Sequence, residues 1–281
     1  MIKKQTIALV TGANSGMGKA TAFALANQDS QVIMLCRNEV KGKQAQEEIV
    51  NKTGNTKVDL LLCDFADLTD VRRFASHFNK TYGQLNVLVN NAAIISTKRQ
   101  ESKQGYELQF AVNHLAPFLL TNLLMDKLIG GAPARIVNVS SGAYKFGRLH
   151  FDDLQSEKKY RTFKAYAQTK LANILFTYEL SRRFQERHVT ANCLHPGAVS
   201  TNLGIDRDTG FGKTIVKLLK PFFKTPEEGS QTAVYLATSA EIEDVTGKYF
   251  ENKKEVKTKD ITHNEKLSSR LWSVSEELVG L

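Results

Sequence analysis

Long apolar runs are what this sequence most clearly lacks. No stretch of its 281 residues approaches the roughly 18 consecutive apolar residues that a membrane-spanning helix needs. The opening stretch MIKKQTIALVTG has only a short apolar run before Thr11-Gly12, too short for the core of a signal peptide. We therefore expect neither a transmembrane helix nor a secretory signal, and we expect a cytoplasmic protein.

Cysteine is scarce as well. The chain has three cysteines, no CxxC pair and no cluster with zinc-like spacing; Cys36, Cys63 and Cys193 each end or interrupt an apolar, strand-like run. An odd number of cysteines in such positions favours reduced, buried thiols in a reducing compartment. We expect no metal site.

Acidic residues are outnumbered, with 29 Asp and Glu against 38 Lys and Arg and a formal net charge of +9. Such a surplus can indicate binding to nucleic acid or to an anionic membrane surface. The lysines are spread along the chain, as in ENKKEVKTKD, and are not interleaved with aromatic residues. We expect no nucleic-acid partner, and we assign the charge mostly to solubility and to an anionic ligand.

Short β-branched runs alternate with longer helical ones. The runs are apolar almost throughout, as in a parallel sheet covered on both faces, and predict strands over 6–10, 31–36, 57–63, 86–91, 135–140 and 189–195. Helices are predicted over 17–28, 39–52, 69–81, 105–128 and 160–186. No linker rich in Pro, Gly or Ser divides the chain. We predict a single-domain α/β fold over residues 1–281, a Rossmann-type doubly wound parallel sheet with helices on both faces.

Ligands bind to such a sheet beyond the carboxyl ends of its strands, and the first predicted strand ends in the glycine-rich turn TGANSGMGKA. Gly12, Gly16 and Gly18 permit a tight turn, close approach of the backbone to a pyrophosphate, and a helix start whose N–H groups bind phosphate. A Walker loop is excluded, because Ala13 replaces its first glycine and Ala20 its magnesium-binding Ser or Thr. A merely structural glycine turn is the alternative.

The end of the second strand predicts the cofactor. An acid there would bind the ribose 2′-hydroxyl of NAD, but the strand ends in Cys36-Arg37-Asn38. A guanidinium can bind a 2′-phosphate bidentately, so NADP(H) is favoured. Later strand ends add Asp64 and Phe65, placed to meet the adenine, and Asn91, Ala92 and Ala93, placed to line the adenosine ribose.

A tyrosine and a lysine lie four positions apart in KAYAQTKLANILF, at the start of a predicted helix. On one helical face, the ammonium of Lys170 would lower the pKa of the Tyr166 phenol. For a lone pair of this kind, a half-buried aromatic beside a solvated cation is the usual explanation. Here Ser140 and Ser141 also end the fifth strand, and Asn113 lies in the helix before it.

The motifs T-G-x-x-x-G-x-G, N-N-A-A, S-S and Y-x-x-x-K occur in this order. With them the sequence resembles the short-chain dehydrogenase/reductase family over nearly its whole length. The stretches HFDDLQ, YAQTKLANILFTYEL, HPGAVSTNL, KTPEEGSQT and RLWSVSEELVGL are most similar to the retinol dehydrogenase branch, with protochlorophyllide reductases as distant kin.

The resemblance implies a role for each motif residue. Tyr166 would donate a proton to a carbonyl oxygen, and Ser141, the second serine of its pair, would hydrogen-bond that oxygen. Lys170 would bind the nicotinamide ribose and lower the pKa of Tyr166, while Asn113 would hold a water in a proton relay. The Pro196-Gly197 turn and Thr201 would contact the nicotinamide. The full set of expected cofactor contacts is Gly12, Asn14, Ser15, Gly16, Met17, Gly18, Arg37, Asp64, Phe65, Asn91, Ala92, Ala93, Tyr166, Lys170, Pro196, Gly197, Val199 and Thr201.

Two departures from the family pattern stand out. The usual N-N-A-G is N-N-A-A, so Ala93 replaces a glycine near the cofactor. Ser141 and Tyr166 are 25 positions apart (166 − 141), nearly twice the commoner family spacing. The insertion, residues 142–165, is expected to border the substrate pocket and to hinder the helix-to-helix dimer common in the family, which leaves monomer and homodimer open.

Residues 202–225 predict an amphipathic lid. Its apolar face is Phe211, Ile215, Leu218, Leu219, Phe222 and Phe223, and its basic face is Lys213, Lys217, Lys220 and Lys224. Such a segment can close over the nicotinamide or make peripheral contact with an anionic membrane, and ordinary helix packing is the alternative.

We expect hydride transfer between NADP(H) and an apolar or aromatic carbonyl or alcohol, with Tyr166 as general acid/base. Reduction of an activated C=C bond is a rival of the same fold. A non-catalytic, NADP-binding regulator is a second rival, against which the complete Ser-Tyr-Lys-Asn set argues.

Overall fold

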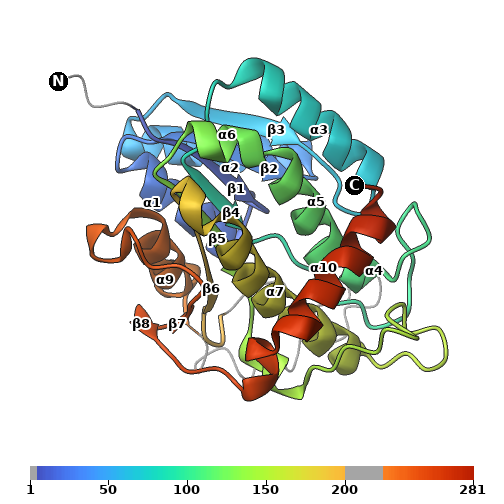
Figure 1. The fold of residues 1–281 in the computed structure, drawn as a ribbon. Coiled ribbons are helices and arrows are strands. Elements are labelled where there is room, and N and C mark those ends of the chain that lie inside the picture. Colours follow the sequence, from blue (N-terminus) through green and yellow to red (C-terminus); the bar gives the residue numbers. More distant parts are fainter. Residues whose placement is uncertain (1–4, 200–223) are drawn as a thin grey trace.

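The six apolar runs of the sequence form six adjacent strands of one sheet, from the edge strand β3 to β6. The structure, a computed structural model, describes residues 5–199 and 224–281, and these build eight strands in the order β3-β2-β1-β4-β5-β6-β7-β8 (Figure 1). Neighbours pair in parallel except β7 with β8. The bounds are β1 Ile7–Thr11, β2 Gln31–Cys36, β3 Val58–Leu62, β4 Val87–Asn90, β5 Ala134–Val139, β6 Val189–His195, β7 Tyr249–Glu251 and β8 Lys254–Glu255. The predicted doubly wound α/β fold is confirmed.

The winding of the sheet reverses between β1 and β4. From β1 the chain adds β2 and β3 on one side, then crosses to the other side of β1 and adds β4, β5 and β6. The carboxyl ends of β1 and β4 therefore diverge into helices on opposite sides, which leaves a crevice between them. Thr11 ends β1 and Asn90 ends β4 at this crevice.

One face of the sheet is covered by helices with small and aliphatic side chains. These helices are α1 (Gly16–Ala26), α2 (Glu39–Thr53) and α9 (Pro226–Thr238) (Figure 1). Their core side chains include Ala22, Leu25, Ala45, Ile49, Ala233 and Leu236, and these pack on the β-branched residues of β1, β2 and β4. Small residues let α1 approach the sheet closely, and this includes its first turn, which follows the glycine-rich turn.

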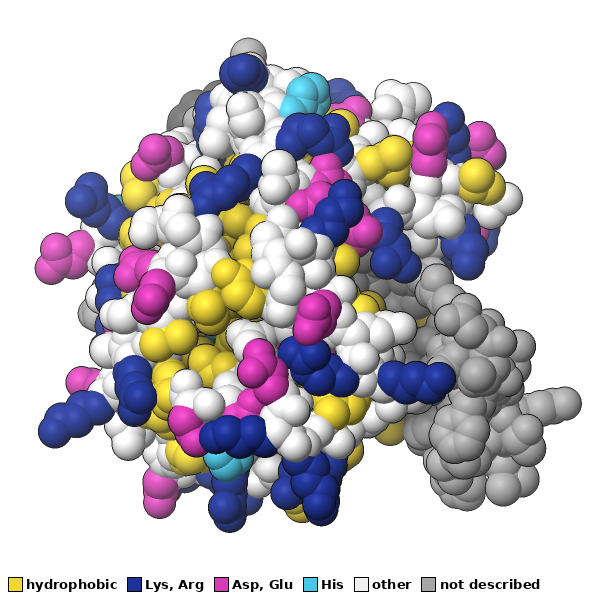
Figure 2. Space-filling model, turned by 90° about the vertical axis from the view of Figure 1, so that its right-hand side faces the viewer, with side chains coloured by type: hydrophobic (Ala, Val, Ile, Leu, Met, Phe, Trp, Pro, Cys, Tyr) yellow, Lys and Arg dark blue, Asp and Glu magenta, His cyan; other side chains and the backbone are white. Residues whose placement is uncertain are grey.

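The other face carries most of the aromatic core. It is covered by α3 (Leu68–Thr81), α5 (Ala116–Leu123), α6 (Met125–Gly130) and α7 (Thr162–Phe184). Trp272 of α10 (Glu265–Val279) meets Phe118 edge to face and Phe176 at a tilt, at centroid distances of 4.9 and 5.8 Å. Figure 2 views the side of the molecule with α3, α5 and α10, where a band of apolar side chains runs between charged ones of both signs.

The helix α10 forms an outer layer across α7 and α5 (Figure 1). Glu179 of α7 is buried, and it accepts hydrogen bonds from Arg182, Arg183 and, across the contact, Ser268 of α10. The guanidinium of Arg183 lies 4.3 Å from the ring centroid of Trp272. These contacts hold α10 against the middle of α7.

The prediction of one continuous helix over residues 105–128 is wrong. The structure divides it into α4 (Leu108–Phe110), a π-helical turn η1 (Ala111–Leu115), α5 and α6. Pro117 lies in the first turn of α5 and has no N–H for the regular helical bond. A π turn makes room for one extra residue and often marks a functional position. Asn113 lies at its centre.

The elements after β6 were missed by sequence patterns. They are α9, β7, β8 and α10, together with the short 3-10 turns η5 (Ala240–Ile242) and η6 (Asp260–His263); η2 (Gly142–Phe146) and η3 (Gln185–Arg187) lie earlier. Thr201 and nearly all of the predicted lid lie outside the described residues. No described helix is long and apolar enough to cross a bilayer.

Candidate active site

The glycine-rich turn is shaped for a phosphate at the start of α1. Gly12 (φ +68°) and Gly16 (φ +54°) adopt left-handed backbone conformations that side chains disfavour. A Cβ atom at Gly18 would lie 2.4 Å from the carbonyl oxygen of Gly12, so no side chain fits there. Ser15 precedes α1 without a side-chain capping bond, and Met17 turns its side chain into the core. The first N–H groups of α1 are thus left for an anion, as a dinucleotide requires.

Hydrogen bonds join the ends of β1 and β4. Thr11 Oγ1 accepts from the N–H groups of Asn91 and Ala92, both at 2.9 Å, and Asn91 Nδ2 donates to the carbonyl of Thr11 at 2.8 Å. The loop that continues through Ala93 is therefore fixed beside the glycine turn. Thr11 was missed as a site residue, although its place in the T-G motif was an available signal.

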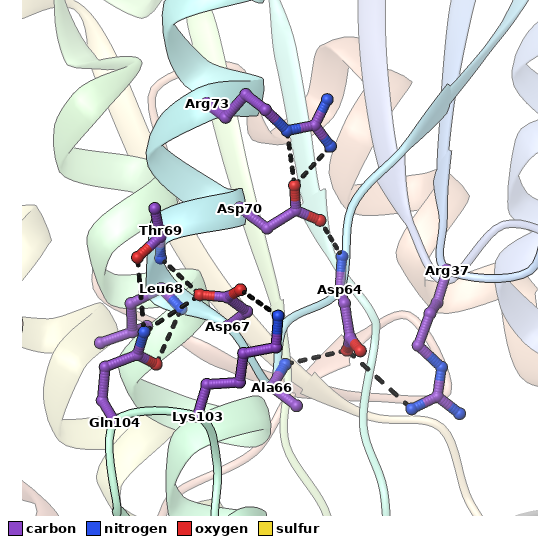
Figure 3. A network of polar contacts seen from close by, with 10 residues as sticks. All are labelled: Arg37, Asp64, Ala66, Asp67, Leu68, Thr69, Asp70, Arg73, Lys103 and Gln104. Atoms are coloured by element: carbon purple, nitrogen blue, oxygen red, sulfur yellow. Dashed lines mark hydrogen bonds and ion pairs between the residues drawn. The ribbon is translucent and has the colours of Figure 1, made fainter.

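Arg37 directly follows β2 and lies opposite Asp64, which comes after β3 (Figure 3). The Arg37 side chain is 64% exposed, and its Nη1 lies 3.9 Å from Asp64 Oδ1. So long and exposed an ion pair is weak, which leaves the guanidinium available to a ligand. The ring of Phe65 is buried in the core, and its contact with an adenine stays a prediction.

A polar network holds the turn after β3 in place (Figure 3). Asp64 donates its N–H to Asp70 Oδ2 at 2.7 Å and accepts from the N–H of Ala66 at 3.0 Å. Asp67 binds Gln104 and Lys103 of the loop before α4, and these contacts lower its pKa to about 2. The network thereby ties the turn after β3 to the segment that leads to Asn113.

Strand β5 and helix α7 bring Ser141, Tyr166 and Lys170 together. Lys170 Nζ lies 5.4 Å from the ring centroid of Tyr166 and donates to the carbonyl of Val139 at 3.0 Å. Ser140 Oγ donates to the carbonyl of Lys170 at 2.8 Å. Ser140 is therefore used in holding α7 against β5, and Ser141 is the serine that hydrogen-bonds Tyr166.

The π turn places the side chain of Asn113 against the backbone of Ile94. Asn113 Oδ1 accepts from the N–H of Ile94 at 2.8 Å, and Nδ2 donates to the Ile94 carbonyl at 2.9 Å and to Thr169 Oγ1 at 3.3 Å. The side chain thus clamps the loop after β4 to the catalytic helix. Both Nδ2 hydrogens have protein partners, so the relay water, which stays a prediction, would need another atom of Asn113 as its partner.

The turn after β6 is enclosed by a lysine. Gly197 has φ +87°, and the Lys224 side chain crosses it so closely that a Cβ atom there would lie 3.1 Å from Lys224 Cδ and Cε. Val199 forms an isolated bridge with Lys224, and His195 Nδ1 accepts from the N–H of Gly197 at 3.4 Å. Pro196 lies between them. Lys224, predicted above on the basic face of the lid, thus lies against the turn that contains Gly197.

Residues 6–210 match the sequence pattern of the family described as short chain dehydrogenase. The chain belongs to this family. It is 44% identical to retinol dehydrogenase 13 of Homo sapiens over 97% of this chain and 84% of that protein. It is 42% identical to human retinol dehydrogenase 14 (97% and 86% covered) and 40% identical to retinol dehydrogenase 12 of Mus musculus (98% and 86% covered). The resemblance to the retinol dehydrogenase branch is confirmed.

Solved structures agree on the fold. A protein from Mycobacterium paratuberculosis is 29% identical with a TM-score of 0.77, covering 99% of this chain and 94% of its own. A short chain dehydrogenase from Shigella flexneri, solved in complex with NADP, is 24% identical with a TM-score of 0.70, covering 89% of this chain and 97% of its own.

Burial decides the electrostatics of the catalytic pair in this short-chain dehydrogenase. It raises the pKa of Tyr166 to about 12, and the hydrogen bond with the Ser141 side chain offsets only part of the rise. It also lowers the pKa of Lys170 to about 8. The net shift of the Tyr166 pKa is therefore upward, and desolvation is its largest cause. That Lys170 lowers the pKa of the phenol stays a prediction.

The insertion leaves the site at Ser141 and returns to it just before Tyr166. Tyr160 Oη donates to the carbonyl of Ser96 at 2.8 Å, Thr162 Oγ1 to that of Thr97 at 3.1 Å, and Arg99 Nε to that of Gln155 at 3.1 Å. Insertion and post-β4 loop thus form one wall beside the catalytic residues. In the described part of the chain, no group of three His, Cys, Asp or Glu side chains could hold a metal ion.

Proposed function

We propose that this short-chain dehydrogenase is an NADP(H)-dependent carbonyl reductase and alcohol dehydrogenase for apolar or aromatic substrates. The observation that carries the proposal is the placement of Ser141, Tyr166 and Lys170 at the end of β5, on the same sheet edge as the glycine turn after β1. Ligands of such sheets bind along that edge, so a nicotinamide would lie beside the phenol.

The protein's own groups favour reduction at neutral pH. Bound NADPH would supply a hydride to the carbonyl carbon. With a pKa of about 12, Tyr166 is protonated and can donate to the carbonyl oxygen, which Ser141 would hydrogen-bond. The resulting phenolate is stabilised by the charged Lys170, because a cation roughly 5 Å away contributes about 3 kcal/mol at an effective dielectric near 20. Lys170, with a pKa of about 8, is also suited to return a proton to the phenolate.

Arg37 supports NADP(H) over NAD(H). Its guanidinium is exposed at the end of β2 and has only a weak pairing with Asp64. A 2′-phosphate would offer a stronger, bidentate partner.

An apolar substrate is supported by the relatives. The named relatives are retinol dehydrogenases, and retinol is an apolar alcohol.

The chain's buried, unpaired cysteines, Cys36, Cys63 and Cys193, fit a reducing compartment, and we propose the cytoplasm.

A panel of aldehydes, ketones, quinones and enones, assayed with NADPH and with NADH, tests the proposal. We expect apolar and aromatic aldehydes to be reduced to alcohols with NADPH and at a lower rate with NADH. A sugar aldehyde is the polar control. Exclusive reduction of the C=C bond of the enones, or cofactor binding without turnover on any member, would contradict the assignment.

A further inference from the structure

Two phenylalanine rings lie side by side on the surface near the catalytic residues. Phe146 ends η2 and Phe163 lies in the first turn of α7; their side chains are 70% and 54% exposed and their ring centroids 5.7 Å apart. Exposed large apolar side chains that cluster usually mark an interaction site. Neither ring has a place in the mechanism proposed above.

Exposed cations flank both rings. Lys145 and Arg148 flank Phe146 in the sequence, and Arg161 and Lys164 flank Phe163. Lys259, from the segment after β8, donates to the carbonyl of Lys145 at 2.7 Å and so brings a fifth cation to the same place. Within the described residues, none of the five forms an ion pair with a carboxylate. The two rings and these five cations are called here the aromatic-basic patch.

We propose that the aromatic-basic patch docks the protein on an anionic lipid bilayer, independently of the function proposed above. Phenyl rings partition into the boundary between headgroups and acyl chains, while surrounding Lys and Arg side chains reach anionic headgroups. Rings that project from the surface suit a fluid interface, whereas a protein partner would have to supply a complementary surface. A second copy of this chain is disfavoured, because five like charges would face five others.

Docking through this patch would turn the catalytic edge toward the lipid. Phe163 precedes Tyr166 by three positions on α7, so the two lie within one helical turn of each other. The insertion that begins at Ser141 contains Phe146. This consequence, unlike the docking itself, rests on the proposed function: an apolar substrate dissolved in the bilayer would enter beside Tyr166 without crossing water.

Vesicle flotation with phosphatidylcholine, with and without phosphatidylserine, tests the patch. We expect binding to the anionic vesicles that weakens as salt is added. Phe146→Ser/Phe163→Ser should weaken it at least about tenfold, and Arg161→Gln/Lys164→Gln about tenfold or more, because each cation near an anionic surface contributes to binding.

Matched control variants remove an exposed apolar side chain, or two positive charges, outside the aromatic-basic patch. Val40 of α2 is 66% exposed, so Val40→Ser deletes an exposed apolar side chain away from the patch. Lys80→Gln/Lys127→Gln removes two charges on α3 and α6, at the far end of the molecule from the start of α7 (Figure 1). Both controls should bind vesicles like wild type, and all variants should keep the wild-type melting temperature.

Four results would overturn the proposal. They are no binding of wild type to anionic vesicles, equal losses in the controls, unchanged binding of the phenylalanine variant, and a lipid-free dimer that this variant abolishes. A raised KM of that variant for a small soluble substrate, with vesicle binding intact, would assign the rings to the substrate entrance instead.

Discussion

The two halves of the sheet's carboxyl edge prepare their sites by different means. At β1, β2 and β3 the site is made of glycines, helix N–H groups and one exposed arginine, Arg37, with few buried polar side chains. At β4, β5 and α7 it is made of buried polar side chains that hold one another, among them Asn113, Ser140 and Lys170. The first half needs close backbone approach, and the second needs side chains brought from distant parts of the chain.

The difference teaches which changes should affect which step. Changes in the glycine half should alter cofactor affinity and choice, and changes in the polar half should alter turnover. A substitution in the glycine half that lowered turnover alone, or one in the polar half that changed cofactor choice, would contradict this comparison.

The largest expected effect is that of Tyr166→Phe. Removing the hydroxyl removes the proposed proton donor, so turnover should fall by about 10² to 10⁴. The dissociation constant of NADPH should stay near wild type, because the ring and its packing remain. Steady-state kinetics and fluorescence titration measure the two. Tyr235→Phe, on α9, is the control and should leave both unchanged; retention of most activity by Tyr166→Phe would remove Tyr166 from its role.

Arg37→Asp should reverse the cofactor preference. Wild type should bind NADPH at least about tenfold tighter than NADH at low salt, since charge-assisted hydrogen bonds contribute about 1.5 to 3 kcal/mol. The aspartate removes that donor and repels a 2′-phosphate, while turnover at saturating NADH should change little. Arg187→Asp makes the same charge change at the opposite edge of the sheet. Equal affinities in wild type, or an unaltered preference in Arg37→Asp, would exclude Arg37 from the site.

Gly18→Ala should weaken the binding of NADPH and of NADH to a similar degree. Its Cβ atom would meet the carbonyl oxygen of Gly12 at 2.4 Å, and overpacking of this kind costs about 1–3 kcal/mol. Gly130→Ala is a matched control, because a Cβ atom there meets nothing within 4 Å. Isothermal titration with NADPH and NADH compares the two variants. A loss confined to one cofactor would show that the turn does not contact their shared pyrophosphate.

Glu179→Gln should destabilise the polar half without altering cofactor choice. It weakens contacts with Arg182, Arg183 and Ser268 under α10, and we expect a loss of about 2 kcal/mol in the free energy of unfolding at neutral pH. Burial alone would raise the pKa of Glu179, but hydrogen bonds from Arg182 and Arg183 outweigh it and hold that pKa below its usual value.

The pH dependence of that loss follows from the sign of the shift. A depressed carboxyl pKa stabilises the folded state above the unfolded pKa, and this stability disappears as pH falls through the folded value. The difference between wild type and Glu179→Gln should thus be full at neutral pH and shrink below about pH 4. Urea unfolding across this range measures it, with the exposed Glu186→Gln as control. A pH-independent difference would mean that packing, not charge, is lost.

Sequence patterns predict the glycine half of the site more completely than the polar half. The turn, Arg37 and the strand ends are contiguous in the chain, so spacing alone predicts them. The π turn at Asn113 could not be read from periodicity, because its register depends on packing against Ile94, although Pro117 signals a break. The raised pKa of Tyr166 was also missed, since burial of a side chain is a property of the fold.

The missed C-terminal elements have a physical reason too. Strands β7 and β8 are three and two residues long, flanked by Asn and Lys, and are too short for an alternating pattern. Lys224 was assigned to a helical face by spacing, but the structure pairs it with Val199 beside Gly197. Contacts between segments far apart in the chain decide both.

The most direct test of the account follows the hydride itself. Wild type is incubated in ordinary water with an apolar aldehyde and with NADPH that carries deuterium at both C4 positions of the nicotinamide, and the alcohol is analysed by mass spectrometry. The account predicts one cofactor-derived deuterium on the former carbonyl carbon, and its formation should slow in Tyr166→Phe. Alcohol without deuterium, or unchanged transfer in Tyr166→Phe, would contradict it.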